Sequence, residues 1–98
     1  MTVCILSTNA TQDLNAIANY FAARNVDAGE KLFEQFMSKC KNLTKFPALG
    51  RSYEHIRPNM RGIPLDGYII FYQAMNDQLE VLRVVNSRQD LEALFSID

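Results

Sequence analysis

Ninety-eight residues with 48% hydrophobic and 21% charged side chains predict one globular domain spanning residues 1–98. The net charge of -1 argues against a protein that binds nucleic acid tightly on its own, because such proteins are usually basic. The apolar run near the N-terminus is too short for a signal peptide or a membrane span, so we expect a cytoplasmic protein with no membrane partner.

The first quarter of the chain predicts a strand followed by a helix. Residues 2–7 are apolar and β-branched, which is typical of a strand. Asn9 then stands as a candidate N-cap, with Gln12 at the capping-box position. Apolar side chains follow at the i, i+3, i+4, i+7 spacing of an amphipathic helix, which should end near residues 24–25.

A second amphipathic helix should begin at Asp27, with Glu30 at its capping-box position. It carries a wide apolar stripe and ends before Pro47, because the residue preceding a proline is pushed out of helical geometry. The short break between the two helices predicts an antiparallel helical hairpin.

The second half of the chain predicts a meander of three strands after an irregular segment at 48–59. Asp66-Gly67 is a strong hairpin signal, and Asn76-Asp77 forms the next turn. The strands are expected at residues 60–65, 68–74 and 78–85. Ser87 is a candidate cap for a last short helix, which has Asp90 in its first turn and contains Leu91, Leu94 and Phe95.

The predicted fold class is therefore α+β, with the order β-α-α-β-β-β-α. The helical hairpin should cover one face of a small antiparallel sheet, and a short helix should end the chain. The first strand should join the sheet at an edge or beside its middle.

Arg83 is unusual because it lies within an apolar strand pattern, where a charge needs a partner. One interpretation is a structural ion pair, with Asp66, Asp90 or Glu92 as candidate partners. The other is that Arg83 and Arg61 project from one sheet face and bind an anion, since a guanidinium makes paired hydrogen bonds to carboxylate or phosphate. Arg61 could equally be an ordinary solvated residue.

Strand alternation predicts which side chains share a face with Arg83. If Leu82 and Val84 face the helices, Arg83 stands on the opposite face of the sheet. Tyr68 and Tyr72 alternate with Ile69 and Phe71, so one face would offer tyrosines beside an arginine. These tyrosines fit half-buried sheet residues better than a surface for stacking bases.

His55, Cys4 and Cys40 have no spacing typical of a catalytic or metal site. His55 lies in a polar loop, where a solvated side chain is the simpler interpretation than a general acid or base. The two cysteines lie in apolar patterns and favour buried free thiols over a disulfide. We expect no metal site, because no ligand pair has the spacing of a helix or a zinc knuckle.

Three segments in a fixed order make the chain similar to a known family. They are FPALGR, then an arginine before the hairpin RGIPLDGYIIFY, and finally EVLRVVNSRQDL. In this order, over about residues 3–95, they resemble the RelE/ParE toxins of bacterial type II toxin–antitoxin pairs, and they are closer to ParE. The family fold, two helices on a small antiparallel sheet with a C-terminal helix, agrees with the order predicted above.

The resemblance leaves three functions open. A ParE-like toxin would inhibit DNA gyrase and needs no catalytic residue. A RelE-like toxin would be a ribosome-dependent mRNA interferase, with Arg61 and Arg83 stabilising the transition state and His55 or Tyr53 moving a proton. An inactivated toxin would retain only antitoxin binding. Glu54 before Arg61 and the absence of tyrosine or histidine after RQDL favour ParE.

The resemblance also implies partners. A cognate antitoxin should neutralise the chain, the pair should serve plasmid stabilization, and operator DNA should be bound only through the antitoxin, with no sequence-specific DNA binding by this chain. No cofactor is implied. The residues expected to contact the antitoxin or the target are Arg61, Tyr68, Tyr72, Arg83 and Arg88.

Overall fold

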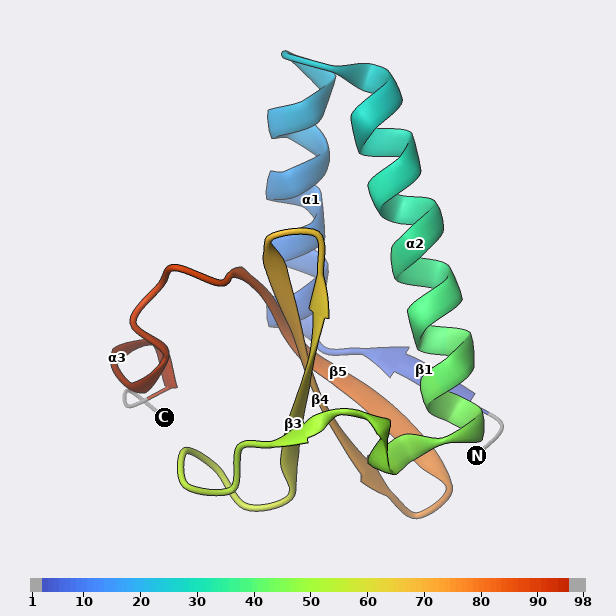
Figure 1. The fold of residues 1–98 in the computed structure, drawn as a ribbon, viewed down its shortest axis with the longest axis vertical. Coiled ribbons are helices and arrows are strands. Elements are labelled where there is room, and N and C mark those ends of the chain that lie inside the picture. The colour runs from blue at the N-terminus through green and yellow to red at the C-terminus, as the bar shows by residue number, and fades with distance from the viewer. Residues whose placement is uncertain (1–2, 96–98) are drawn as a thin grey trace.

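A computed structural model describes residues 3–95 and shows a helical hairpin standing against a five-stranded sheet (Figure 1). Helix α1 spans Thr8–Ala22, α2 spans Val26–Lys45, and the short α3 spans Leu91–Phe95. The α+β class and the order of the predicted elements are confirmed. Among the described residues, no helix combines the length and the apolar character needed to cross a membrane.

The sheet is mixed because its first strand runs parallel to its neighbour. The strand order is β1-β5-β4-β3-β2. The first strand, β1, therefore lies at an edge of the sheet, which is one of the two positions predicted for it. Strands β2 to β5 pair antiparallel, whereas β1 pairs parallel with β5. The strands are β1 (Val3–Leu6), β2 (Arg51–Ser52), β3 (Met60–Leu65), β4 (Tyr68–Met75) and β5 (Gln78–Asn86). The predicted start of the first strand at residue 2 lies outside the described residues.

Both predicted hairpin turns form, and each uses residues that tolerate a left-handed backbone. Asp66 and Gly67 have φ values of 45° and 87°, and Asn76 and Asp77 have values of 52° and 63°. Two consecutive positive φ angles are the geometry of a type I′ turn, whose twist matches that of the strands it joins. The meander therefore follows from local chemistry. The irregular segment contributes a single 3₁₀ turn, η1 (Pro47–Leu49), and the short β2.

The caps of the helices differ from the predicted ones. Ser7, not Asn9, caps α1, with its Oγ accepting a hydrogen bond from the N–H of Ala10. Asn25 caps α2 in the same way. Asp90 rather than Ser87 caps α3, because its carboxylate accepts from a backbone N–H in the first turn. In each case the cap is the residue directly before the first helical turn. Several nearby Ser, Asn and Asp residues have the side chain needed for an N-cap, so the sequence did not distinguish between them.

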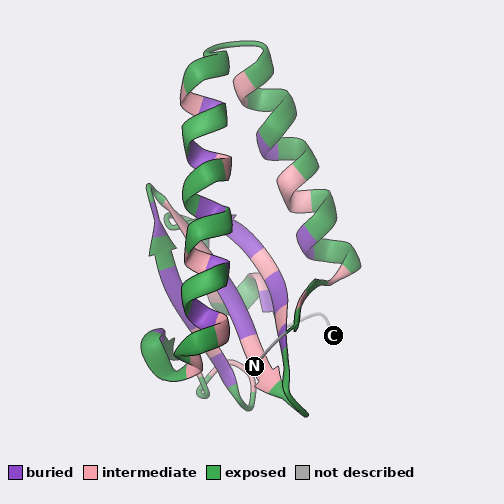
Figure 2. Cartoon of the chain, turned by 90° about the vertical axis from the view of Figure 1, so that its right-hand side faces the viewer, coloured by how far each residue is buried: buried purple, intermediate pink, exposed green. Residues whose placement is uncertain are grey.

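Two hydrophobic clusters sandwich the sheet, and Figure 2 shows the buried residues concentrated on its strands. The larger cluster fills the space between the sheet and the helical hairpin, and includes Leu32, Phe36, Leu43, Ile70 and Tyr72. The smaller one lies on the opposite face under α3, and consists of Met60, Phe71, Leu82, Val85 and Phe95. The hairpin extends beyond the sheet, where its residues are largely exposed (Figures 1 and 2).

A β-bulge in β5 changes which residues face the helices. Consecutive residues of β4 pair with Val81 and Arg83, so Leu82 is the extra residue. Val81 and Val84 consequently belong to the cluster under the helices, and Leu82 belongs to the opposite one. The prediction that Leu82 and Val84 share a face was wrong, since uninterrupted alternation does not hold across a bulge.

Candidate functional site

Arg83 forms a two-pronged ion pair with Asp13 of α1. Its Nε lies 2.7 Å from Asp13 Oδ2 and its Nη2 lies 3.0 Å from Oδ1. The two side chains are 22% and 16% exposed, so the pair is largely shielded from water. The hydrogen bonds that Arg83 donates to Asp13 raise the pKa of Arg83, and the charge of Arg83 is already matched within the fold.

The ion pair arises because β1 covers only part of the edge of β5. Leu6, the last residue of β1, pairs with Val81, and beyond that point β5 has no neighbouring strand on this side. Ser7 Oγ donates to the carbonyl of Leu82 at 2.8 Å, and Asp13 Oδ2 accepts from the N–H of Val84 at 3.0 Å. Side chains from the start of α1 therefore replace the missing strand.

The partner of Arg83 was predicted wrongly. Asp66, Asp90 and Glu92 were the expected carboxylates, all close to Arg83 in the sequence or in the adjacent hairpin. Asp13 lies far away in the sequence, and only the packing of α1 on β5 brings it within reach. One signal was present, because Asp13 is the only charged residue of α1.

A groove of about 540 Å³ lies beside this ion pair, between α1 and β5. Tyr68 and Arg83, both expected at a partner-binding site, line it together. Burial, and then the neighbouring Tyr20, raise the pKa of Tyr68. Arg88 is exposed on the loop between two further lining residues. The groove is lined by Asp13, Ala16, Ile17, Tyr20, Phe21, Tyr68, Arg83, Val84, Val85, Asn86 and Gln89.

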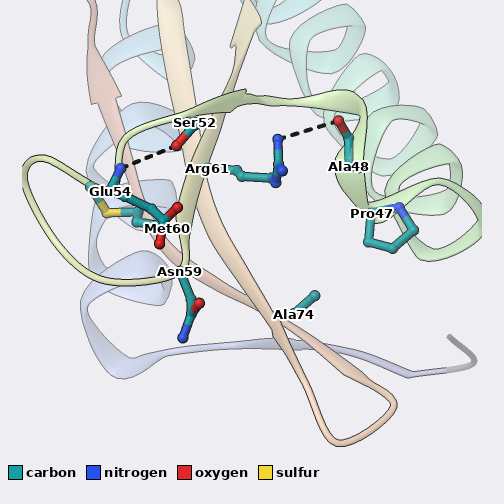
Figure 3. Close-up of a pocket in the computed structure, with 8 residues that line it drawn as sticks. All are labelled: Pro47, Ala48, Ser52, Glu54, Asn59, Met60, Arg61 and Ala74. Carbon is teal, nitrogen blue, oxygen red and sulfur yellow. Dashed lines mark hydrogen bonds between the residues drawn. The ribbon is translucent and has the colours of Figure 1, made fainter.

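Arg61 lies at a second cavity, of about 240 Å³, near the β2 edge of the sheet (Figure 3). Its Nη1 donates to the carbonyl of Gly50 at 2.7 Å and, more weakly, to that of Ala48 at 3.4 Å. The guanidinium thus ties β3 to the turn of the FPALGR segment. Arg61 is half-buried and keeps part of its donor capacity for a partner.

Tyr72 has an internal role and does not belong to the surface, which corrects its expected place in the binding site. It is fully buried, and its hydroxyl donates to the carbonyl of Pro47 at 2.7 Å and accepts from the N–H of Gly50 at 2.9 Å. Burial raises the pKa of the Tyr72 phenol, so the donated proton is retained at neutral pH. A Cβ at Gly50 would lie 2.5 Å from this hydroxyl, which explains the glycine.

The four residues of the ribonuclease hypothesis do not converge on one site. Arg61 lies on the sheet face that the helices cover, and Arg83 lines cavities at the far edge of the sheet. Tyr53 packs on the opposite face, with its ring centroid 5.0 Å from that of Phe71. The ring of His55 lies beside Tyr53 rather than beside either arginine. Arg61 and Arg83 therefore line different cavities and do not gather around one phosphate position.

The fold is that of a small α+β protein with an open groove between α1 and β5. The family model for the ParE toxin of the type II toxin–antitoxin system parDE matches residues 4–91. The chain therefore belongs to the ParE toxin family, which confirms the resemblance inferred from the sequence.

Structural similarity agrees with this assignment. One similar solved structure is described as the chromosomal ParDE toxin–antitoxin system of P. aeruginosa. The superposition has a TM-score of 0.72 at 17% sequence identity, and it covers 88% of this chain and 96% of that chain. At this identity the likeness supports the fold. None of the curated protein sequences matches the chain.

Proposed function

We propose that this chain is a cytoplasmic toxin that inhibits DNA gyrase by binding it, with no chemical step of its own. Membership of the ParE family supports the toxin role. The separation of Arg61 from Arg83 supports binding over RNA cleavage, because phosphoryl transfer needs its cations gathered around one phosphate. Arg83 is in addition already paired with Asp13.

Expression without an antitoxin tests this proposal. We expect growth arrest with a DNA-damage response, and we expect the purified chain to inhibit supercoiling by gyrase in vitro. Messenger RNA on translating ribosomes should stay intact. Ribosome-dependent cleavage that is lost in Arg61→Ala would instead establish the RelE-like activity. A folded chain that neither arrests growth nor inhibits gyrase would mean an inactivated toxin, and would overturn the proposal.

We further propose that a cognate antitoxin neutralises the chain by covering the groove between α1 and β5. The groove combines aromatic and apolar side chains with the nearby exposed Arg88, which suits an amphipathic segment carrying carboxylates. It continues towards an apolar hollow of about 340 Å³ between the helices, lined by Phe21, Val26 and Phe33 among others. Operator DNA would then be reached only through the antitoxin.

Charge reversal at Arg88 tests the position of this interface. Within the described residues its guanidinium makes no ion pair, so Arg88→Glu should leave folding intact. We expect Arg88→Glu to weaken antitoxin binding about tenfold or more, measured by calorimetry at low and high salt. Arg51→Glu is the matched control, an exposed arginine on β2 at the other edge of the sheet. Equal losses for both variants, or none for Arg88→Glu, would place the interface elsewhere.

A further inference from the structure

Two cysteines that are distant in the sequence meet in the fold. Cys4 lies on β1 opposite Leu79, which belongs to the cluster beneath the helices, and Cys40 lies on the buried face of α2 in the same cluster. The strand β1 and the helix α2 are in contact, and each thiol shifts the pKa of the other. Both thiols are free in this structure. Two thiols that share one cluster, between a strand and the helix packed on it, are candidates for a disulfide.

We propose that Cys4 and Cys40 form a dithiol site that oxidises to an intrachain disulfide by exchange with a small-molecule disulfide such as glutathione disulfide. The site does not depend on which target the toxin binds. It goes beyond the sequence-based expectation of buried free thiols, because nothing in the sequence indicates that β1 packs against α2.

The surroundings of the two sulfurs set the order of the reaction. Cys4 is half-buried on an edge strand, so a small disulfide can reach it, whereas Cys40 is only 7% exposed. Burial raises the pKa of both thiols, that of Cys40 to about 12, and the neighbouring Cys40 lowers the pKa of Cys4 in part. Cys4 is therefore the attacking thiol and Cys40 the resolving one.

The exchange balances in two steps. The Cys4 thiolate attacks one sulfur of glutathione disulfide, forming a mixed disulfide and releasing one glutathione thiolate, which takes up the proton that Cys4 lost. Cys40 then loses its proton and attacks the Cys4 sulfur, releasing the second glutathione as a thiolate that takes up that proton. Two protein thiols are oxidised to one disulfide, and one glutathione disulfide is reduced to two thiols.

The disulfide would connect the edge strand β1 directly to α2. In the reduced protein β1 is held to the sheet by only one neighbouring strand, with Val3 and Leu6 more than 40% exposed. A bond from residue 4 to residue 40 closes a loop that contains all of α1, which restricts the unfolded chain. The oxidised protein should therefore be markedly more stable than the reduced one.

Equilibration of the purified chain in glutathione buffers of increasing oxidising strength tests the site. We expect a monomer that loses two hydrogens in mass, no longer reacts with maleimide under denaturing conditions, and yields a peptide linking Cys4 to Cys40. Its Tm should rise by on the order of 10 °C and return to the reduced value with dithiothreitol.

Two variants define the outcomes. Cys40→Ala should stop the reaction at a mixed disulfide on Cys4, and Cys4→Ala should leave Cys40 largely unreacted. Wild-type protein that accumulates glutathione adducts, forms only disulfide-linked dimers, or keeps both thiols free under oxidising buffer would overturn the proposal. The wild-type measurement decides this even if a variant at the buried Cys40 fails to fold.

Discussion

Asp13→Ala should lower the free energy of unfolding by about 2–4 kcal/mol, because it removes the acceptor of three hydrogen bonds at once. The change leaves the guanidinium of Arg83 largely shielded without its partner, and exposes the N–H of Val84 at an unpaired strand edge. Urea denaturation with an unchanged slope against urea concentration would measure the loss. The same variant should loosen the start of α1 from β5.

The control for Asp13 is Glu34→Ala, which removes an exposed carboxylate from α2 and should change stability by less than about 0.5 kcal/mol. A double-mutant cycle with Arg83→Ala should show a coupling energy of about 1–3 kcal/mol between Asp13 and Arg83. If the losses of stability in the two single variants add up to the loss in the double variant, the interaction between Asp13 and Arg83 does not itself contribute to stability. Any loss of toxicity in Arg83→Ala must be compared with this loss of stability before a direct contact is assigned.

Phe71→Ala should cost about 3–5 kcal/mol, the largest effect expected for a single side chain here. Phe71 is fully buried in β4, and its ring makes edge-to-face contacts with Tyr53 at 5.0 Å and Phe95 at 5.2 Å between centroids. Removal of the ring leaves a cavity under α3, and the small number of apolar side chains around it limits how far they can move in to fill it. Thermal and urea unfolding would measure the loss.

Met75→Ala is the control on the same strand, since Met75 is 49% exposed and its truncation should change stability little. Phe95→Ala should cost less than Phe71→Ala, because α3 is a helix of only five residues on one face of the sheet and can detach without unfolding the sheet. Equal losses for Phe71→Ala and Phe95→Ala would show that α3 unfolds together with the sheet.

The elements could be predicted because their signals are local. Asp66-Gly67 and Asn76-Asp77 dictate tight turns by themselves, and Pro47 ends a helix whatever surrounds it. The amphipathic periodicity of the two helices is equally local. Competing caps were harder, because Ser7 and Asn9 are both good cap residues, and the position where the chain leaves β1 decided between them.

The site could be predicted only in part. Tyr68 and Arg83 do meet at one groove, yet Tyr72 lies inside the core and Arg61 at a different cavity. The error came from the bulge at Leu82 and from which sheet face the helices cover, and neither leaves a clear mark in the sequence. Asp13 was missed because an ion pair between distant segments has no spacing to recognise.

The sequence by itself determined the kind of elements, their order and the ParE-like family, because periodicity, turn chemistry and motif order are properties of neighbouring residues. Tertiary structure alone decided that Arg83 pairs with Asp13, that Tyr72 holds the FPALGR turn from beneath, and that Cys4 meets Cys40. Each of these contacts joins segments far apart in the chain, and their distance is set by how the hairpin docks on the sheet.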